Sequence, residues 1–121
     1  MKFLLIMQVN PAVLDALTEE ERDSLNGHEG FMNKIRESGE FVATQALADP
    51  TNSVTVRGTG GVPAVTDGPF LEAKEFMGGY YLVDVESKER AVELAQLIPD
   101  AKLNGLAIEV RPVMFEAGFD I

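Results

Sequence analysis

The chain has 121 residues, 45% of them apolar, which suits a single domain with a modest hydrophobic core. It contains no cysteine, and this excludes disulfides, thiolate metal sites and cysteine nucleophiles. Twenty acidic and ten basic residues give a net charge of −10, which repels phosphate backbones and anionic membrane surfaces. We therefore expect neither a nucleic-acid partner nor a membrane partner.

Residues 2–9 (KFLLIMQV) are nearly all apolar and predict a strand that is covered on both faces. This run is shorter than the roughly 18 apolar residues of a membrane span. Gln8, Asn10 and Pro11 follow without the small residues of a signal-peptide cleavage site. The N-terminus is thus interpreted as a buried strand, and we expect a cytoplasmic protein. A short turn of helix is expected over 11–16.

A longer helix is predicted from Thr18 to Gly39. Thr18 and Glu21 fit a capping box, and Gly39 fits the position that ends a helix. Gly27 and Gly30 weaken its middle, so that a break or bend there is compatible with the pattern. The inward stripe at helical spacing is Leu25, His28, Met32 and Ile35.

The remaining elements are mostly short strands. The predicted strands are 40–47, a hairpin of 53–57 and 62–66 around residues 58–61, then 80–85 and 107–113. Ser87 caps a second helix that ends near Pro99. The order β-α-β, β-hairpin, β-α-β predicts one α+β domain over 1–121 with a ferredoxin-like architecture and both helices on one face of the sheet.

The second face of this sheet is expected to be apolar as well. In strand 80–85, Tyr80 and Leu82 point one way, while Tyr81, Val83 and Val85 point the other. Burying a standard interface of about 800 Å² per partner gives a gross gain on the order of 10 kcal/mol, which association entropy offsets in part. We therefore predict a sheet-to-sheet homodimer. The alternative is that loops or the C-terminal tail cover this face.

Three segments resemble a known family. They are Asp67-Gly68-Pro69-Phe70, then Glu72-x-Lys74-Glu75, then Gly78-Gly79-Tyr80-Tyr81. This string resembles the DGPF signature of YCII-related proteins, and the opening strand, the helix with His28 and the closing Glu109-Val110-Arg111-Pro112 are also similar. The resemblance covers nearly the whole chain. It implies a dimeric α+β barrel, a site with a His–Asp pair, and an association with sigma factors of the extracytoplasmic-function class.

His28 and Asp67 are the candidate catalytic residues. His28 is the only histidine and lies on the inward stripe of its helix, where an imidazole needs a partner. Asp67 opens a turn that would bring it beside that helix. Such a pair would fix the tautomer and make the other ring nitrogen a general base. The alternatives are a hydrogen-bonded core or interface histidine and an aspartate that only caps its turn.

Further candidates are assigned to ligand binding. Phe70 is either a core plug or a platform for a ligand. Lys74 and Glu75 supply a cation and a second carboxylate for a substrate, or they form a solvated ion pair. Gly78 and Gly79 allow close backbone approach or a bulge.

Tyr80 and Tyr81 point to opposite faces, one toward the helices and one toward a dimer cavity. Arg111 is a candidate contact for an anion, with an ordinary surface arginine as the alternative. One histidine, no cysteine and scattered carboxylates predict no metal site.

Three functions remain open from sequence. The first is an enzyme without an organic cofactor, in which His28 and Asp67 move a proton on a small, anionic or neutral organic molecule. The second is a non-catalytic sensor of a small ligand, or an adaptor in a sigma-factor system. The third is a stable dimer without a ligand.

Overall fold

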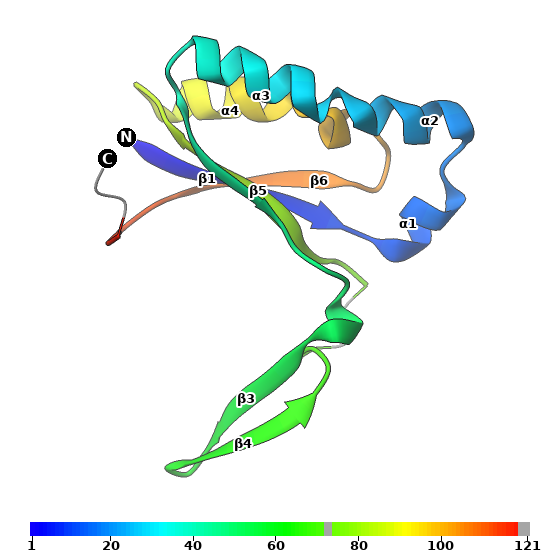
Figure 1. Ribbon diagram of the computed structural model, residues 1–121, viewed down its shortest axis with the longest axis vertical. Helices are drawn as coiled ribbons and strands as arrows, with labels where there is room; N and C mark the ends of the chain where they lie inside the picture. Colours follow the sequence, from blue (N-terminus) through cyan, green and yellow to red (C-terminus); the bar gives the residue numbers. More distant parts are fainter. Residues whose placement is uncertain (72–73, 119–121) are drawn as a thin grey trace.

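A four-stranded antiparallel sheet with helices on one face makes up the body of the molecule (Figure 1). The computed structural model describes residues 1–71 and 74–118. The strands are β1 (Lys2–Val9), β2 (Phe41–Ala46), β5 (Phe76–Asp84) and β6 (Ala107–Pro112), in the order β2-β5-β1-β6. With β1 and β5 at the centre and β2 and β6 at the edges, the sheet has the predicted ferredoxin-like α+β arrangement, which is confirmed.

Within the described residues, four helices and three short 3₁₀ turns connect the strands. The helices are α1 (Pro11–Ala16), α2 (Glu19–Ser24), α3 (His28–Glu37) and α4 (Lys88–Gln96), and the turns are Leu25–Gly27, Pro50–Asn52 and Pro99–Lys102. The capping box between Thr18 and Glu21 is present at the start of α2. The long predicted helix is broken at Leu25–Gly27, and a side chain at Gly27 would lie 3.1 Å from the ring of Pro99.

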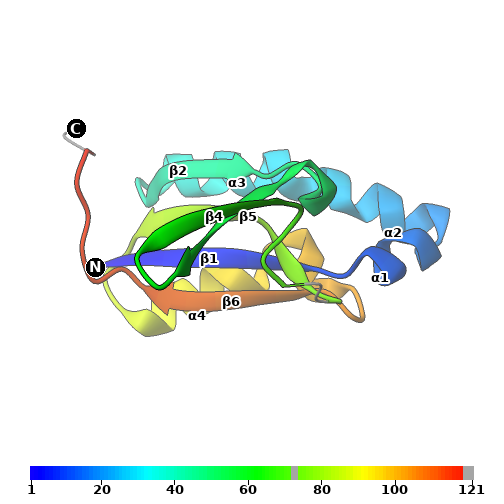
Figure 2. The same cartoon turned by 90° about the horizontal axis from the view of Figure 1, so that it is seen from below.

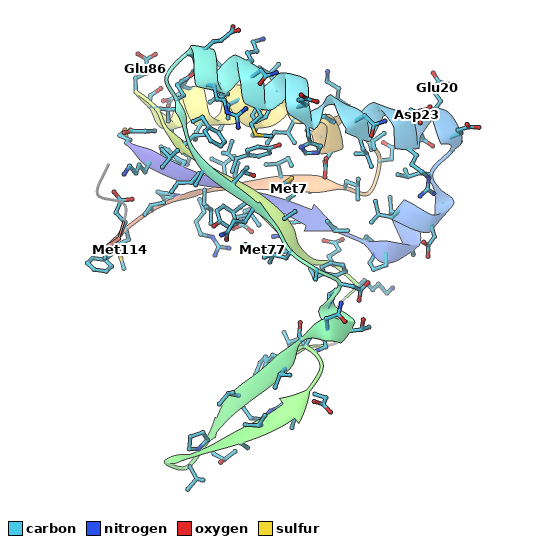
Figure 3. All side chains as sticks on the ribbon, viewed as in Figure 1. Met7, Glu20, Asp23, Met77, Glu86 and Met114 are labelled. Atoms are coloured by element: carbon cyan, nitrogen blue, oxygen red, sulfur yellow. The ribbon has the colours of Figure 1, made fainter. Side chains whose placement is uncertain are left out.

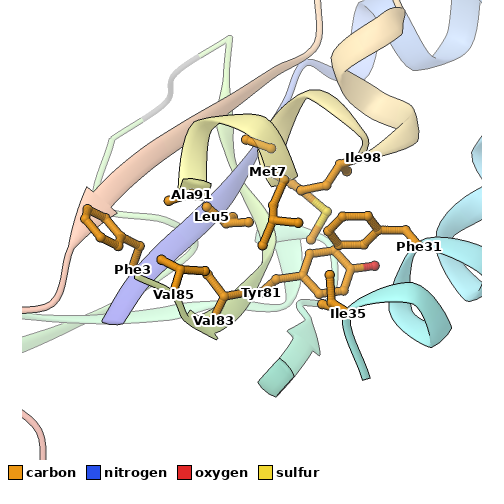
Figure 4. Close-up of a cluster of buried hydrophobic side chains, with 12 residues drawn as sticks. Phe3, Leu5, Met7, Phe31, Ile35, Tyr81, Val83, Val85, Ala91 and Ile98 are labelled. Atoms are coloured by element: carbon orange, nitrogen blue, oxygen red, sulfur yellow. The ribbon is translucent and has the colours of Figure 1, made fainter. Parts of the chain in front are cut away.

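The break changes which side chains of α3 reach the core. Phe31 and Ile35 are buried, whereas Leu25 and Met32 from the predicted stripe are only half-buried. Ile35 of the predicted stripe is thus fully buried and Met32 packs against the core, while Phe31, which the stripe did not include, is the second buried residue of α3. The core fills the space between sheet and helices (Figure 4) and consists of Phe3, Leu5, Met7, Phe31, Ile35, Tyr81, Val83, Val85, Ala91, Leu94, Ala95 and Ile98.

The opposite face of the sheet, here called the open face, carries no helix among the described residues (Figures 1 and 3). Pairing places Leu4, Ile6, Tyr80 and Leu82 together on it. Ile6 and Leu82 at its centre are already 4% exposed, since cross-strand neighbours screen them. Met114 and Phe115 of the C-terminal tail are 98% and 81% exposed, so this described part of the tail does not cover an apolar surface.

The second sheet is a hairpin that stands apart from the body. Strands β3 (Val54–Thr59) and β4 (Val62–Asp67) pair only with each other among the described residues. The turn between them has two residues, Gly60 and Gly61, both with positive φ, so it is tighter than the predicted turn over 58–61. Figure 2, seen from below, shows this hairpin in front of the sheet and the helices behind it.

Candidate functional site

His28 lies between an acid and a phenol. It is the first residue of α3, where the preceding 3₁₀ turn aims its ring toward the sheet. Its Nε2 is 2.7 Å from Oδ1 of Asp100, in the turn after α4, and its Nδ1 is 2.7 Å from the hydroxyl oxygen of Tyr81 on β5. The His28 and Tyr81 rings stack, with centroids 5.9 Å apart and planes 12° apart. Three elements thus converge on one imidazole.

The chemistry of the partners assigns a direction to each of these hydrogen bonds. A carboxylate only accepts, so Nε2 of His28 donates its proton to Asp100. In the neutral ring Nδ1 then carries a lone pair, and it accepts from the Tyr81 hydroxyl. The result is a chain in which Tyr81 donates to His28 and His28 donates to Asp100.

Tyr81 holds its proton firmly. Burial raises the pKa of Tyr81 to about 12, and the negative charge of Asp100 adds to this shift. Its ring is 2% exposed and meets Phe31 edge to face, with centroids 4.9 Å apart (Figure 4). A proton can therefore leave the hydroxyl only when another replaces it, which suits a relay and not a free phenolate.

A cavity of about 360 Å³ opens beside this chain, and His28, Tyr81 and Asp100 all contribute to its wall. Four apolar side chains, Met7, Val9, Met32 and Ala46, line the rest of it together with Thr44, Gln45 and Gly78. No lysine or arginine is among these lining residues. The side chain of His28 is 29% exposed, so its ring is reached from the cavity and is not sealed in the core.

Two glycines allow the strands to meet at this cavity. A side chain at Gly79 would lie 2.6 Å from the backbone oxygen of Gln45, and one at Gly78 would lie 2.3 Å from a methyl carbon of Val9. The register between β1 and β5 shifts between Met7 and Gln8, opposite this pair. The predicted bulge and close approach at Gly78-Gly79 are thus present.

Asp67 lies elsewhere in the chain. It ends β4 in the hairpin that projects away from the helices, and it is exposed (Figure 1). The structure pairs His28 with Asp100 instead of the predicted Asp67. The reason is topological: β4 belongs to the separate hairpin, whereas the turn at Pro99–Lys102 follows directly from α4, which packs beside α3 in the helical layer.

The other predicted ligand contacts are dispersed, apart from Tyr81. Phe70 is 62% exposed and lies under the guanidinium of Arg57, 5.1 Å from its ring centroid. Lys74 and Glu75 are exposed just before β5, and the motif residue Glu72 lies outside the described residues.

Tyr80 and Arg111 lie on the open face of the sheet. The hydroxyl of Tyr80 donates to Oε1 of Gln45 at 2.8 Å, and Arg111 pairs with Glu109. Pairing of β1 with β5 and β6 puts both residues on the side away from the helices. Of the two tyrosines, Tyr81 therefore faces the helices and Tyr80 the open face.

Asp100 was not among the candidates from sequence. It is one of twenty acidic residues and is 72 positions from His28. Its only distinguishing signal is its place after Pro99, directly beyond a predicted helix. That signal fits a turn as well as a site.

The described residues contain no group of three or more histidine, cysteine, aspartate or glutamate side chains placed to hold a metal ion. Among the helices of 1–71 and 74–118, none has the length and apolar character needed to cross a membrane.

Comparison with known proteins identifies the relatives of this chain. A family model described as the YCII-related domain matches residues 1–116. The chain belongs to the YCII-related family. An uncharacterized protein of Rhizobium meliloti (strain 1021) is similar to this YCII-related chain, with 32% identity over 95 residues, which cover 78% of the chain and 77% of that protein. These findings give the family and no specific activity.

Proposed function

We propose that this YCII-related chain is a small enzyme, working without an organic cofactor, that moves a proton on a small organic molecule bound beside His28. The observation that carries the proposal is the directed chain Tyr81–His28–Asp100 at the wall of a 360 Å³ cavity. An imidazole held by a carboxylate is a general base, and the hydroxyl of Tyr81 connects it to the cavity.

The proton moves in two linked transfers. A proton leaves a C–H or O–H bond of the substrate for the hydroxyl oxygen of Tyr81, while the proton of that hydroxyl passes to Nδ1 of His28. The imidazolium that forms is balanced by the carboxylate of Asp100 at 2.7 Å. Return of a proton to the same atom amounts to exchange with solvent, and return to another atom amounts to isomerisation.

The lining of the cavity favours an uncharged substrate. Its lining residues include no lysine or arginine and do include the acid Asp100, within a chain of net charge −10. An anion would lose its hydration there without gaining a counter-charge. Thr44 is among the lining residues; its hydroxyl donates to the backbone oxygen of Tyr80 at 2.8 Å, so its oxygen can accept from a hydroxyl group of the substrate.

The test is deuterium exchange from D₂O into a panel of small neutral ketones, esters and lactones, followed by proton NMR. We expect catalysed loss of the signal next to the carbonyl for at least one compound. Tyr81→Phe and His28→Asn should abolish that catalysis, whereas Tyr80→Phe and Asp67→Asn serve as matched controls that retain it. Catalysis that survives both Tyr81→Phe and His28→Asn would contradict the proposal.

One observation favours a second candidate, a non-catalytic sensor. Both ring nitrogens of His28 already have partners within the chain, so a ligand in the cavity finds no free ring nitrogen. A sensor would show ligand-dependent shifts of the His28 and Tyr81 signals in NMR spectra, without deuterium entering any compound of the panel.

The proposed partner of this chain is a second copy of itself, paired through the open face of the sheet. The support is the apolar row of Leu4, Ile6, Tyr80 and Leu82, which no helix of the described residues covers. A homodimer with this arrangement would leave the cavity at His28 on the helix side of each sheet.

A further inference from the structure

The hairpin Val54–Asp67, here called the arm, lies outside the central sheet. Its strands pair with each other and with no other strand that the structure describes. It leaves the body where β2 ends and β5 begins, on the side opposite the helices (Figures 1 and 2). An isolated two-stranded hairpin is only marginally stable in water.

The two faces of the arm differ. One face is partly covered by the segment that follows β4: the hydroxyl of Thr55 donates to the backbone oxygen of Gly68 at 2.7 Å, and Arg57 lies over the ring of Phe70. Thr55 and Ala64 on this face are half-buried. The chain thus protects the more polar side of its own arm.

The other face, here called the valine face, carries Val54, Val56 and Val65. These side chains are 60%, 64% and 66% exposed, and the register pairs Val56 directly with Val65. An exposed row of β-branched residues on a hairpin with two unpaired edges promotes association. The valine face therefore needs a cover that one copy of the described chain does not supply.

We infer that the valine face packs against a second copy of this chain, so that each arm clasps its partner. This inference rests on the proposed homodimer and states what holds it together. The centre of the open face is already nearly closed, with Ile6 and Leu82 at 4% exposure, and stacked sheets alone would bury little further apolar surface. The exposed apolar surface is on the arm.

Position and size support the same partner. The arm leaves the body on the side of the open face, so a copy stacked on that face meets the arm (Figure 2). A twofold axis brings both arms into equivalent contacts. The residues that share the valine face make up about a quarter of the roughly 20–30 residues that each partner brings to a standard interface, and the open face supplies the rest. They are Val54, Val56, Gly58, Pro63, Val65 and Asp67.

The absence of cysteine allows a direct test. Val56 and Val62 lie on opposite faces of the arm and are 64% and 66% exposed, so the thiols of Val56→Cys and Val62→Cys should react equally fast with a maleimide in a single chain. With the arm packed on a partner, we expect the Val56→Cys thiol to react several-fold more slowly as protein concentration rises. The Val62→Cys thiol should keep its rate. Equal rates at every concentration would overturn the inference.

Light scattering separates this inference from the proposed pairing of sheets. The wild-type chain should show twice the 13.2 kDa mass of one copy, and the double variant Val56→Asp/Val65→Asp should show one copy with an unchanged far-ultraviolet circular dichroism spectrum. Val62→Asp is the matched control and should stay dimeric. A double variant that stays dimeric would refute the clasp and leave the sheet pairing in place. A wild-type chain that is monomeric, or that needs a different protein to associate, would refute both, while the exchange chemistry at His28 would stand.

Discussion

The central sheet and the arm are built from the same kind of strand, but apolar side chains at the centre of the sheet are buried and the valines of the arm are exposed. Both are antiparallel and rich in valine, yet Val83 on β5 is fully buried and Val56 on β3 is 64% exposed. The sheet is backed by α3 and α4, whose buried side chains fill the space over it, whereas the arm has only the segment after β4 on one side. Strand pattern therefore determines pairing in both regions, but only the sheet obtains a core from its own chain.

The largest expected difference in the free energy of unfolding is between a valine replaced in the sheet and a valine replaced in the arm. Val83→Ala removes methyl groups from a closed core and should lower the free energy of unfolding by about 3 kcal/mol, from lost burial plus the cavity left behind. Val56→Ala on the arm should change it by less than about 0.5 kcal/mol. Urea unfolding at the lowest workable protein concentration measures both. Similar costs for the two variants would mean that the arm folds against the body.

The next comparison concerns two aspartates, one from each region. Asp100→Asn takes a charged acceptor from His28 at a 7% exposed position and should cost about 1.5–3 kcal/mol, the range for hydrogen bonds to charged groups. Asp67→Asn changes an exposed residue of the arm and should be nearly neutral. Thermal unfolding of both variants at neutral pH tests this. If Asp67→Asn proved the more costly one, the assignment of the acid partner to Asp100 would fail.

A smaller effect is expected from Tyr81 at alkaline pH. Its pKa is raised from 10.0 to about 12 by burial, so the folded state holds the proton more tightly than the unfolded state. The resulting stability is complete below pH 10 and is lost as the pH rises from 10 to 12. At roughly 1.4 kcal/mol per pKa unit the loss is about 1.4 kcal/mol by about pH 11 and nearly twice that in full. Unfolding midpoints between pH 8 and 11 should fall less steeply for Tyr81→Phe than for the wild type. Tyr80→Phe, which changes the open face, should follow the wild-type profile.

The sequence predicts the sheet better than it predicts the site, for physical reasons. Apolar alternation, the capping box at Thr18 and the glycine pair at Gly79 are local patterns, and each one is found where expected. The partner of His28 is a contact across 72 positions, made by the packing of two helices. No local pattern distinguishes Asp100 from the other acidic residues, whereas Asp67 stands out in a motif. The exposure of the valine face could not be predicted either, because alternating apolar residues normally indicate a strand whose apolar face is buried in a core.

The smallest effect tests whether the two regions unfold together. Each region has an arginine over a phenylalanine ring: Arg36 is 5.2 Å from the centroid of Phe41 in the body, and Arg57 is 5.1 Å from that of Phe70 beside the arm. Replacing either arginine with glutamine should cost under about 1 kcal/mol. Because α3 and β2 belong to the cooperative body, Arg36→Gln should speed the exchange of the slowest amide protons throughout the sheet. Arg57→Gln should speed amide exchange only within Val54–Asp67, since the arm opens locally without the body. Faster exchange across the central sheet in Arg57→Gln would show instead that the arm and the body are one folding unit.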